Sequence, residues 1–326
     1  MFRKFDCIGI GDPAFDVILD IPDAELYDVP TTEGIDLCLP FGKKILITSR
    51  TFSPGGNANN TIVGLARLGL KTGYYGVVGG DEYGSFLIQN LEQEKVKIKW
   101  IKKEKNGATN YSTILNYKGE RTILVQHMRH THSLPSFPRT RWVYASTVSD
   151  DSTRIWTQLA TGSRKGKYFF ALTPDVQHLT HDSAKAHKIL QSVSLLFVNK
   201  EEADEIIRES FRTMKRRLRA LAELGVKMMC VTDGVNGAFA FDGTRYWRID
   251  IAEVNVKERT GAGDAFAAGV LAGMIQGKSL SRSLIWGMLN SASVVTHVGS
   301  QAGLLSRKDI KRWEARYPKL KARQLR

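Results

Sequence analysis

The chain has 326 residues, of which 42% are hydrophobic and 25% charged, as in a globular protein with a buried core. No apolar run approaches the roughly 18 residues of a membrane-spanning helix, which excludes a helical membrane protein. Much of the formal net charge of +14 lies in residues 212–219 and 307–326, where no aromatic platform for nucleic acid accompanies it, so we expect neither nucleic acid nor membrane as a partner.

The N-terminus and the cysteines bear on the cellular compartment. Residues 1–6 lead directly into a strand-like run and lack the apolar region of a signal peptide. Cys7, Cys38 and Cys230 are scattered along the chain without the spacing of metal ligands. We therefore expect a protein of the reducing cytoplasm.

The first 130 residues contain two helical patterns among short β-like runs. Apolar spacing predicts helices over residues 57–68 and 83–91, and the first stops before Gly69. A hairpin is expected within an all-β excursion, a small lid built from about 16–50 and 97–128. The β-like runs are residues 5–10, 74–78, 98–101, 111–115 and 121–125.

After residue 145, short β runs alternate with longer helical patterns. This alternation implies βαβ units and a parallel sheet. The fold class is therefore α/β: one domain over residues 1–326, with a doubly wound, Rossmann-like, mainly parallel sheet flanked by helices, plus the small β-sheet lid. The predicted strands are 168–172, 195–198 and 228–231. The predicted helices are 182–190, 200–224, 262–276, 280–298 and 306–316.

The most informative segment is a small-residue turn, Gly261-Ala262-Gly263-Asp264, which leads into an apolar helix. The first N–H groups of a helix lack intrahelical partners, and glycines let them crowd around an anion. A carboxylate repels phosphate, so Asp264 makes chemical sense at such a site if a proton must be accepted there. This suggests phosphoryl transfer to a hydroxyl with Asp264 as the base. The alternative is an acidic residue that only stabilises the helix start.

Two better-known nucleotide motifs are nearly matched and are rejected. Residues 9–14 fit the dinucleotide pattern loosely, but the extended-looking residues 15–22 follow where that motif needs a helix. Residues 277–279 resemble the end of a phosphate-binding loop, but they follow a helix and Ala272 replaces the required glycine. A nicotinamide-dependent oxidoreductase is therefore disfavoured.

Three further segments each allow a ligand or a plain turn. Gly55 and Gly56 let a ligand approach the backbone, and Asn60 offers a donor and an acceptor, although Asn57 would serve equally as a helix cap. Asn199 and Glu202 follow a buried strand, where a carboxylate can hold Mg²⁺ or only cap a helix. Thr232 and Gly234 end another strand, where they either touch a phosphate tail or form a tight turn.

In this order along the chain, these segments resemble the PfkB, ribokinase-like family of carbohydrate and nucleoside kinases. The resemblance covers residues from about 5 to 310. It implies ATP as phosphoryl donor, Mg²⁺, and phosphorylation of the hydroxymethyl group of a small sugar, with a nucleoside as the alternative acceptor. The implied roles are Asp264 as base; Gly261, Ala262 and Gly263 as anion hole; Asp16, Gly55, Gly56 and Asn60 for the sugar; Asn199, Thr232, Gly234 and Asn290 for the nucleotide; and Glu202 for the metal.

The sequence also departs from the family pattern. Glu258 stands where the family often has an aspartate linked with a monovalent cation, and Arg259 adds a positive charge that would contact ATP. Asn57 replaces the lysine of ribokinases proper. The open alternatives are a nucleoside kinase, with Phe41, Tyr111 or Tyr117 stacking on a base, and a catalytically silent binding protein. By analogy with the family, we also expect a homodimer that pairs through lid strands.

Overall fold

The computed structural model describes residues 4–22, 25–28, 35–180 and 183–325. The strands of its central sheet are β1 (Phe5–Ile10), β6 (Thr72–Tyr75), β11 (Thr140–Ala145), β12 (Phe169–Leu172), β13 (Leu195–Asn199), β14 (Met229–Thr232), β15 (Ala238–Phe241), β16 (Tyr246–Ile249) and β17 (Arg323–Gln324). In the described residues their order is β17-β16-β15-β14-β13-β12-β11-β1-β6. Neighbouring strands are parallel among β14, β13, β12, β11, β1 and β6. Strands β15, β16 and β17 extend the other edge of the sheet in antiparallel pairing.

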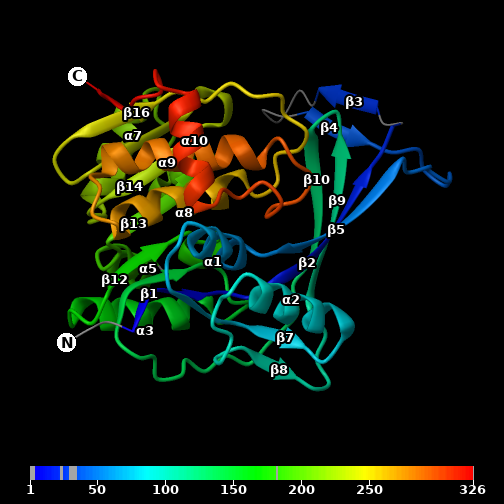
Figure 1. Cartoon of the computed structure of the whole chain (residues 1–326), viewed down its shortest axis with the longest axis horizontal. Helices are drawn as coiled ribbons and strands as arrows, with labels where there is room; N and C mark the ends of the chain where they lie inside the picture. Colours follow the sequence, from blue (N-terminus) through cyan, green and yellow to red (C-terminus); the bar gives the residue numbers. More distant parts are fainter. Residues whose placement is uncertain (1–3, 23–24, 29–34, 181–182, 326) are drawn as a thin grey trace.

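Helices cover both faces of this sheet (Figure 1). One face carries α1 (Asn57–Arg67), α8 (Ala262–Ile275) and α9 (Leu280–Val294), with α10 (Arg307–Arg316) against α9. The other face carries α3 (Ser152–Arg164), α5 (Ser183–Leu190), α6 (Lys200–Ile207) and α7 (Met214–Glu223). Short helical turns occur at α4 (Gln177–Thr180) and η1 (Gly234–Asn236).

Alternate side chains of each central strand enter opposite cores. In β11, Trp142 and Tyr144 pack on the α1–α8–α9 side, while Val143 and Ala145 pack on the α3–α5 side. Because both faces are buried, such strands are apolar almost throughout, which is typical of a parallel sheet. The predicted doubly wound α/β fold is confirmed.

A second sheet stands beside the carboxyl ends of the central strands (Figure 1). It consists of β2 (Ala14–Asp20), β5 (Ser49–Gly55), β9 (Asn110–Tyr117) and β10 (Glu120–Gln126), in the order β10-β9-β2-β5. Helix α2 (Glu82–Gln93) packs against β2 and β5. Two small two-stranded sheets complete the described residues: β3 (Glu25–Asp28) with β4 (Ile35–Cys38), and β7 (Val77–Gly79) with β8 (Lys102–Glu104).

Several predicted elements need correction. Residues 98–101 form no strand, and the next strand, β8, pairs with β7 and not with the second sheet. The predicted helix 200–224 is two helices, because Arg208 adopts a left-handed conformation (φ 61°) that ends α6. Helix α3 was not predicted, although Ile155, Trp156 and Leu159 have the helical spacing that signals it.

No helix within the described ranges is both long and apolar enough to cross a lipid bilayer.

Candidate active site

A cavity of about 580 Å³ lies between the strand ends of the central sheet and the second sheet. In an open parallel sheet, ligands bind outside the carboxyl ends of the strands. Four neighbouring central strands each present a polar residue to this cavity just at or after their ends: Ser146 after β11, Thr173 after β12, Asn199 in β13 and Thr232 in β14.

The N-terminus of α8 forms one wall of the cavity. Gly261 caps the helix at φ 77°, and a Cβ there would lie 2.5 Å from Ser300 Cβ, so the turn requires glycine. A Cβ at Gly263 would meet no atom within 4 Å, because this residue faces open space in the cavity. Ala262 is the first helical residue and does not line the cavity. The wall is therefore the positive end of a helix, where the Ala262 N–H donates to Arg259 O at 3.3 Å and the two glycines line the cavity.

Asp264 lies on the same wall and is held by helix α1. Its Oδ2 accepts a hydrogen bond from Asn60 Nδ2 at 2.9 Å. Asn60 Oδ1 in turn accepts from Ser300 Oγ (3.1 Å) and Gln301 Nε2 (3.0 Å), which fixes the orientation of the amide. Within the described chain, no backbone N–H donates to the Asp264 carboxylate, so plain helix capping does not account for this residue.

Two carboxyl groups in the cavity have pKa values well above the ordinary value of an aspartate. Burial raises the pKa of Asp264 to about 7, partly offset by the Asn60 hydrogen bond and the charge of Arg121. Burial also raises the pKa of Asp16 to about 7, against a hydrogen bond from Ser112 and with added repulsion from Asp264. Both groups are therefore poised to exchange protons near neutral pH.

Asp16 projects from β2, and Gly55 makes room for it. A Cβ at Gly55 would lie 2.0 Å from Asp16 Oδ2, and Gly55 itself does not line the cavity. Gly56 lines the cavity at φ 92° and is the N-cap of α1, a role that the alternative interpretation of the sequence gave to Asn57. Gly55 therefore acts by shaping the site and not by touching a ligand.

Asn199 and Glu202 line the cavity and also form a capping box. Asn199 Oδ1 accepts from the Glu202 N–H at 2.7 Å, and Glu202 Oε2 accepts from the Asn199 N–H at 2.8 Å. Burial raises the pKa of Glu202, and repulsion from Asp175 raises it further. The described residues contain no cluster of three metal-ligating side chains. Mg²⁺ commonly uses only one or two carboxylates together with substrate phosphates and water, so this acidic corner fits it.

Two predicted nucleotide contacts are not at the cavity wall. Gly234 begins η1, is exposed and does not line the cavity, although Thr232 does. Asn290 is fully buried: its Nδ2 donates to Ala265 O at 2.7 Å, and its Oδ1 accepts from Leu305 N at 2.9 Å. Its amide thus ties α9 to α8 and to the chain before α10, away from the cavity lining, and its assignment to the nucleotide stays a prediction.

The aromatic residues expected to stack on a base also lie elsewhere. Tyr111 packs with Phe15 and Tyr83, at ring-centroid distances of 6.3 and 5.8 Å, and does not line the cavity. Neither Phe41, which is fully exposed, nor Tyr117 lines it.

The loop before α8 is held by a buried carboxylate. Glu258 is fully buried, and its two oxygens accept from Thr260 N (2.8 Å) and Gly299 N (2.9 Å). Arg259 pairs with Glu120 of β10 at 2.9 Å, so the loop also contacts the second sheet.

Sequence reasoning missed several cavity residues. Asp12 lies within the dinucleotide-like motif that was rejected. The other missed residues belong to no sequence motif, because they come from unrelated loops and from the second sheet. The missed residues include Asp12, Arg121, His127, Ser149 and Asp175.

A doubly wound sheet, a second sheet over its strand ends, and a carboxylate at a glycine-rich helix start together define a ribokinase-like phosphotransferase. The chain belongs to the pfkB family of carbohydrate kinases, whose family model matches residues 26–307. The resemblance stated from the sequence motifs is confirmed, and the protein is a sugar or nucleoside kinase of this family.

Similar proteins cover most of the chain. It is 30% identical to a fructokinase of Escherichia coli over 68% of this chain and 76% of that protein. It is 25% identical to an ATP-dependent 6-phosphofructokinase of Thermoanaerobacterium thermosaccharolyticum, over 92% and 94%. The structure of a nucleoside kinase of Methanocaldococcus jannaschii, an archaeal member of the ribokinase family, matches with a TM-score of 0.77 at 22% identity, over 97% of this chain and 100% of that one.

Proposed function

We propose that this protein transfers the γ-phosphoryl group of ATP to the hydroxymethyl group of a small sugar. The observation that carries the proposal is the Asp264 carboxyl, a proton acceptor with a pKa of about 7 beside the N-terminus of α8. As the sugar hydroxyl attacks phosphorus, its proton passes to Asp264. The N–H groups of Gly261 and Gly263 would then meet the charge that develops on the transferred phosphoryl group, whereas the Ala262 N–H donates to Arg259 O at 3.3 Å. The name of the phosphofructokinase relative supports ATP as the donor.

The cavity wall favours a sugar over a nucleoside. It presents many hydrogen-bonding groups, as a polyhydroxylated acceptor requires, including Asp16, Asn60, Asn110 and Ser112. Its aromatic lining is Phe197 and Phe266, and the aromatic cluster of the second sheet lies outside the cavity. A nucleoside remains the alternative acceptor. A catalytically silent binding protein is disfavoured, because the relatives are named as kinases and the turn at 261–264 is intact.

A coupled assay of ADP release tests the choice of acceptor. With ATP and Mg²⁺, we expect turnover with one or more ketoses or aldoses that carry a free hydroxymethyl group, and much slower turnover with nucleosides. Turnover with nucleosides alone would contradict a sugar acceptor and support the alternative, a nucleoside kinase. Turnover with neither class would contradict both.

Replacement of the base tests the mechanism. Asp264→Asn keeps the shape of the side chain but cannot accept the proton, so we expect kcat to fall roughly 10²–10⁴-fold, with ATP binding retained. In the wild type, the active form is the ionised carboxylate, so kcat/KM for the sugar should fall about tenfold per pH unit below pH 7. The exposed Asp250, which pairs with Arg248 outside the cavity, gives the control variant Asp250→Asn. Near-normal turnover of Asp264→Asn would contradict the mechanism.

We propose that Glu202, beside Asn199, holds Mg²⁺ against the phosphates of ATP. The ion would neutralise phosphate charge, which Arg121 alone offsets poorly in so acidic a cavity. Glu202→Gln removes the charge but retains the capping box, because glutamine serves equally at this position. We therefore expect a higher Mg²⁺ concentration for half-maximal rate and a lower kcat, at an unchanged Tm. A lowered Tm with normal kinetics would show instead that Glu202 serves only the helix.

The second sheet is proposed to act as a lid and as a dimer contact. Strand β10 lies at its edge and is exposed over all seven residues, and Leu124 of β10 and Phe52 of β5 remain about half exposed. Exposed apolar strand edges are usually covered in native proteins. Light scattering should give twice the 36.4 kDa chain mass at micromolar concentration. Leu124→Lys should shift the mass toward the monomer, whereas a wild-type monomer would contradict the proposal.

A further inference from the structure

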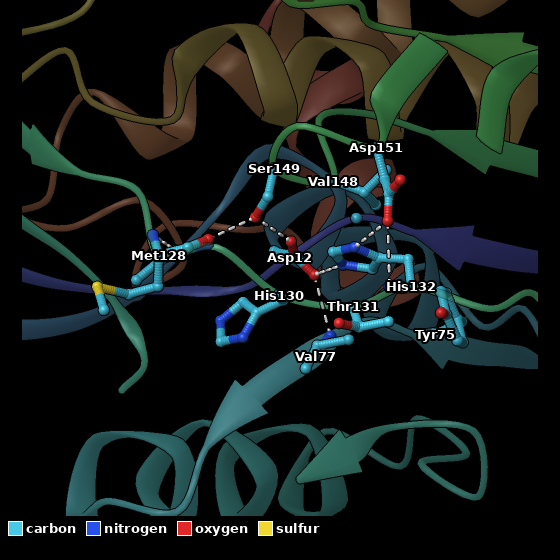
Figure 2. A network of polar contacts seen from close by, with 12 residues as sticks. Asp12, Tyr75, Val77, Met128, His130, Thr131, His132, Val148, Ser149 and Asp151 are labelled. Carbon is cyan, nitrogen blue, oxygen red and sulfur yellow. Dashed lines mark hydrogen bonds and ion pairs between the residues drawn. The ribbon is translucent and has the colours of Figure 1, made fainter. Parts of the chain in front are cut away.

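A buried polar network lies where the chain passes between the two sheets (Figure 2). Asp12 stands between β1 of the central sheet and β2 of the second sheet, is 7% exposed, and lines the cavity. The chain returns from β10 to β11 through residues 127–139, and His132 on this return segment contacts Asp12. The network therefore joins the two chain segments that cross between the sheets, the one from β1 to β2 and the one from β10 to β11.

Asp12 accepts hydrogen bonds from three other segments. Its Oδ1 accepts from Val77 N (3.0 Å) and His132 Nε2 (2.8 Å), and its Oδ2 accepts from Ser149 Oγ (2.9 Å). The Ser149 hydroxyl also lies 2.8 Å from Met128 O, so its single proton is shared between the two acceptors. Through Asp12, the return segment, the loop after β11 and the start of β7 are held together.

His132 is enclosed by carboxylates on both sides. Its side chain is fully buried, with Nε2 against Asp12 and Nδ1 3.4 Å from Asp151 Oδ2. A neutral imidazole donates from one nitrogen only and would turn a lone pair toward the other carboxylate. The protonated ring donates to Asp12 and faces Asp151 with its second N–H. The geometry therefore favours a charged histidine.

The surrounding charges agree with this assignment. Arg154 of α3 pairs with Asp151 at 2.8 Å, so the two carboxylates are balanced by two cations only when His132 is protonated. From the other elements, the ring faces Tyr75 of β6 and His130, both at 6.3 Å, and His130 is itself paired with Glu104 of β8 at 2.8 Å.

The pKa of His132 follows from these contacts. Burial lowers it, but the hydrogen bond and charge of Asp12, together with Asp151, outweigh burial and raise it above its ordinary value. The protonated ring thus persists to a higher pH than in an ordinary histidine and is lost as the pH rises through the raised pKa.

We propose that Asp12 and protonated His132 are positioning residues that fasten the second sheet to the central sheet and so hold the sugar-binding wall in place. The wall depends on this fastening because two of its residues lie close to the network in sequence. Asp16 is on β2, four residues after Asp12, and His127 is the first residue of the return segment. Loss of the His132 proton then weakens sugar binding but leaves phosphoryl transfer at Asp264 unchanged. The inference rests on the proposed sugar kinase function.

The test compares KM for the sugar and kcat between pH 6 and 10 in the wild type and three variants. In the wild type, KM should rise several-fold at alkaline pH while kcat is kept. His132→Gln should show an about tenfold higher KM, the scale of one lost charged hydrogen bond, and this KM should lack the alkaline rise of the wild type once Asp16, with its pKa of about 7, is ionised. Ser149→Gly is compatible with the backbone at φ 41° and should raise KM but retain the pH dependence. His130→Gln, on the same segment but bonded to Glu104, should behave as the wild type.

A second readout does not depend on turnover. In ¹⁵N spectra of the histidine rings of the wild-type protein, the His132 signal should show both nitrogens protonated at pH 7. A singly protonated ring at pH 7, or a wild-type KM that stays constant across the range in which the ring titrates, would overturn the inference. If no acceptor is turned over at all, the proposed function fails, and the ring spectra alone decide the charge of His132. If His132→Gln does not fold, the wild-type profile and Ser149→Gly still decide the outcome.

Discussion

The contact between Asn60 and Asp264 is the constraint on which the rest of the site depends. It joins two residues that are 204 positions apart in sequence and holds the carboxylate in the first turn of α8, at the positive end of that helix. The helices can approach because a Cβ at Gly64 would lie 2.7 Å from Ala268 Cβ, a distance that only glycine avoids. Asn60 is further held by Ser300 and Gln301, so the position of Asp264 is set by packing and not by a flexible loop.

The electrostatics of the cavity follow from this placement. Asp264, Asp16 and Glu202 all have raised pKa values, because burial disfavours their charged forms and each lies near another carboxylate. This is why we propose a neutral polyhydroxylated acceptor and not an acidic one. Such a site also binds a nucleoside triphosphate poorly unless a divalent cation accompanies the phosphates. In the proposed mechanism, the raised pKa of Asp264 suits this carboxylate to accept a proton at neutral pH.

Local sequence patterns predicted much of the fold. The parallel strands could be predicted because burial on both faces makes them apolar throughout. Helix α8 could be predicted because a glycine-rich turn precedes it. The break at Arg208 was missed because it depends on a single left-handed residue. Local motifs also singled out Asp264, the glycines before it and the pair Asn199 and Glu202, which the structure places at the cavity.

The remainder of the site depends on contacts that no local pattern encodes. Asn290 sits on a correctly predicted helix, but its rotation toward Ala265 and Leu305 is decided by packing between helices. Asp12 and His132 are 120 positions apart and meet only because the chain crosses twice between the two sheets. Tyr111 lies on a predicted strand, yet the face that it occupies depends on how β9 pairs with β2.

The most direct test of the central claim is a crystal structure with the best sugar acceptor and a non-hydrolysable ATP analogue. We expect the hydroxymethyl oxygen within about 2.6–3.2 Å of an Asp264 carboxylate oxygen, the reach of a proton acceptor. The terminal phosphate should lie against the N–H groups of Gly261 and Gly263. An acceptor hydroxyl beyond the reach of Asp264, or a terminal phosphate bound away from the start of α8, would contradict the account.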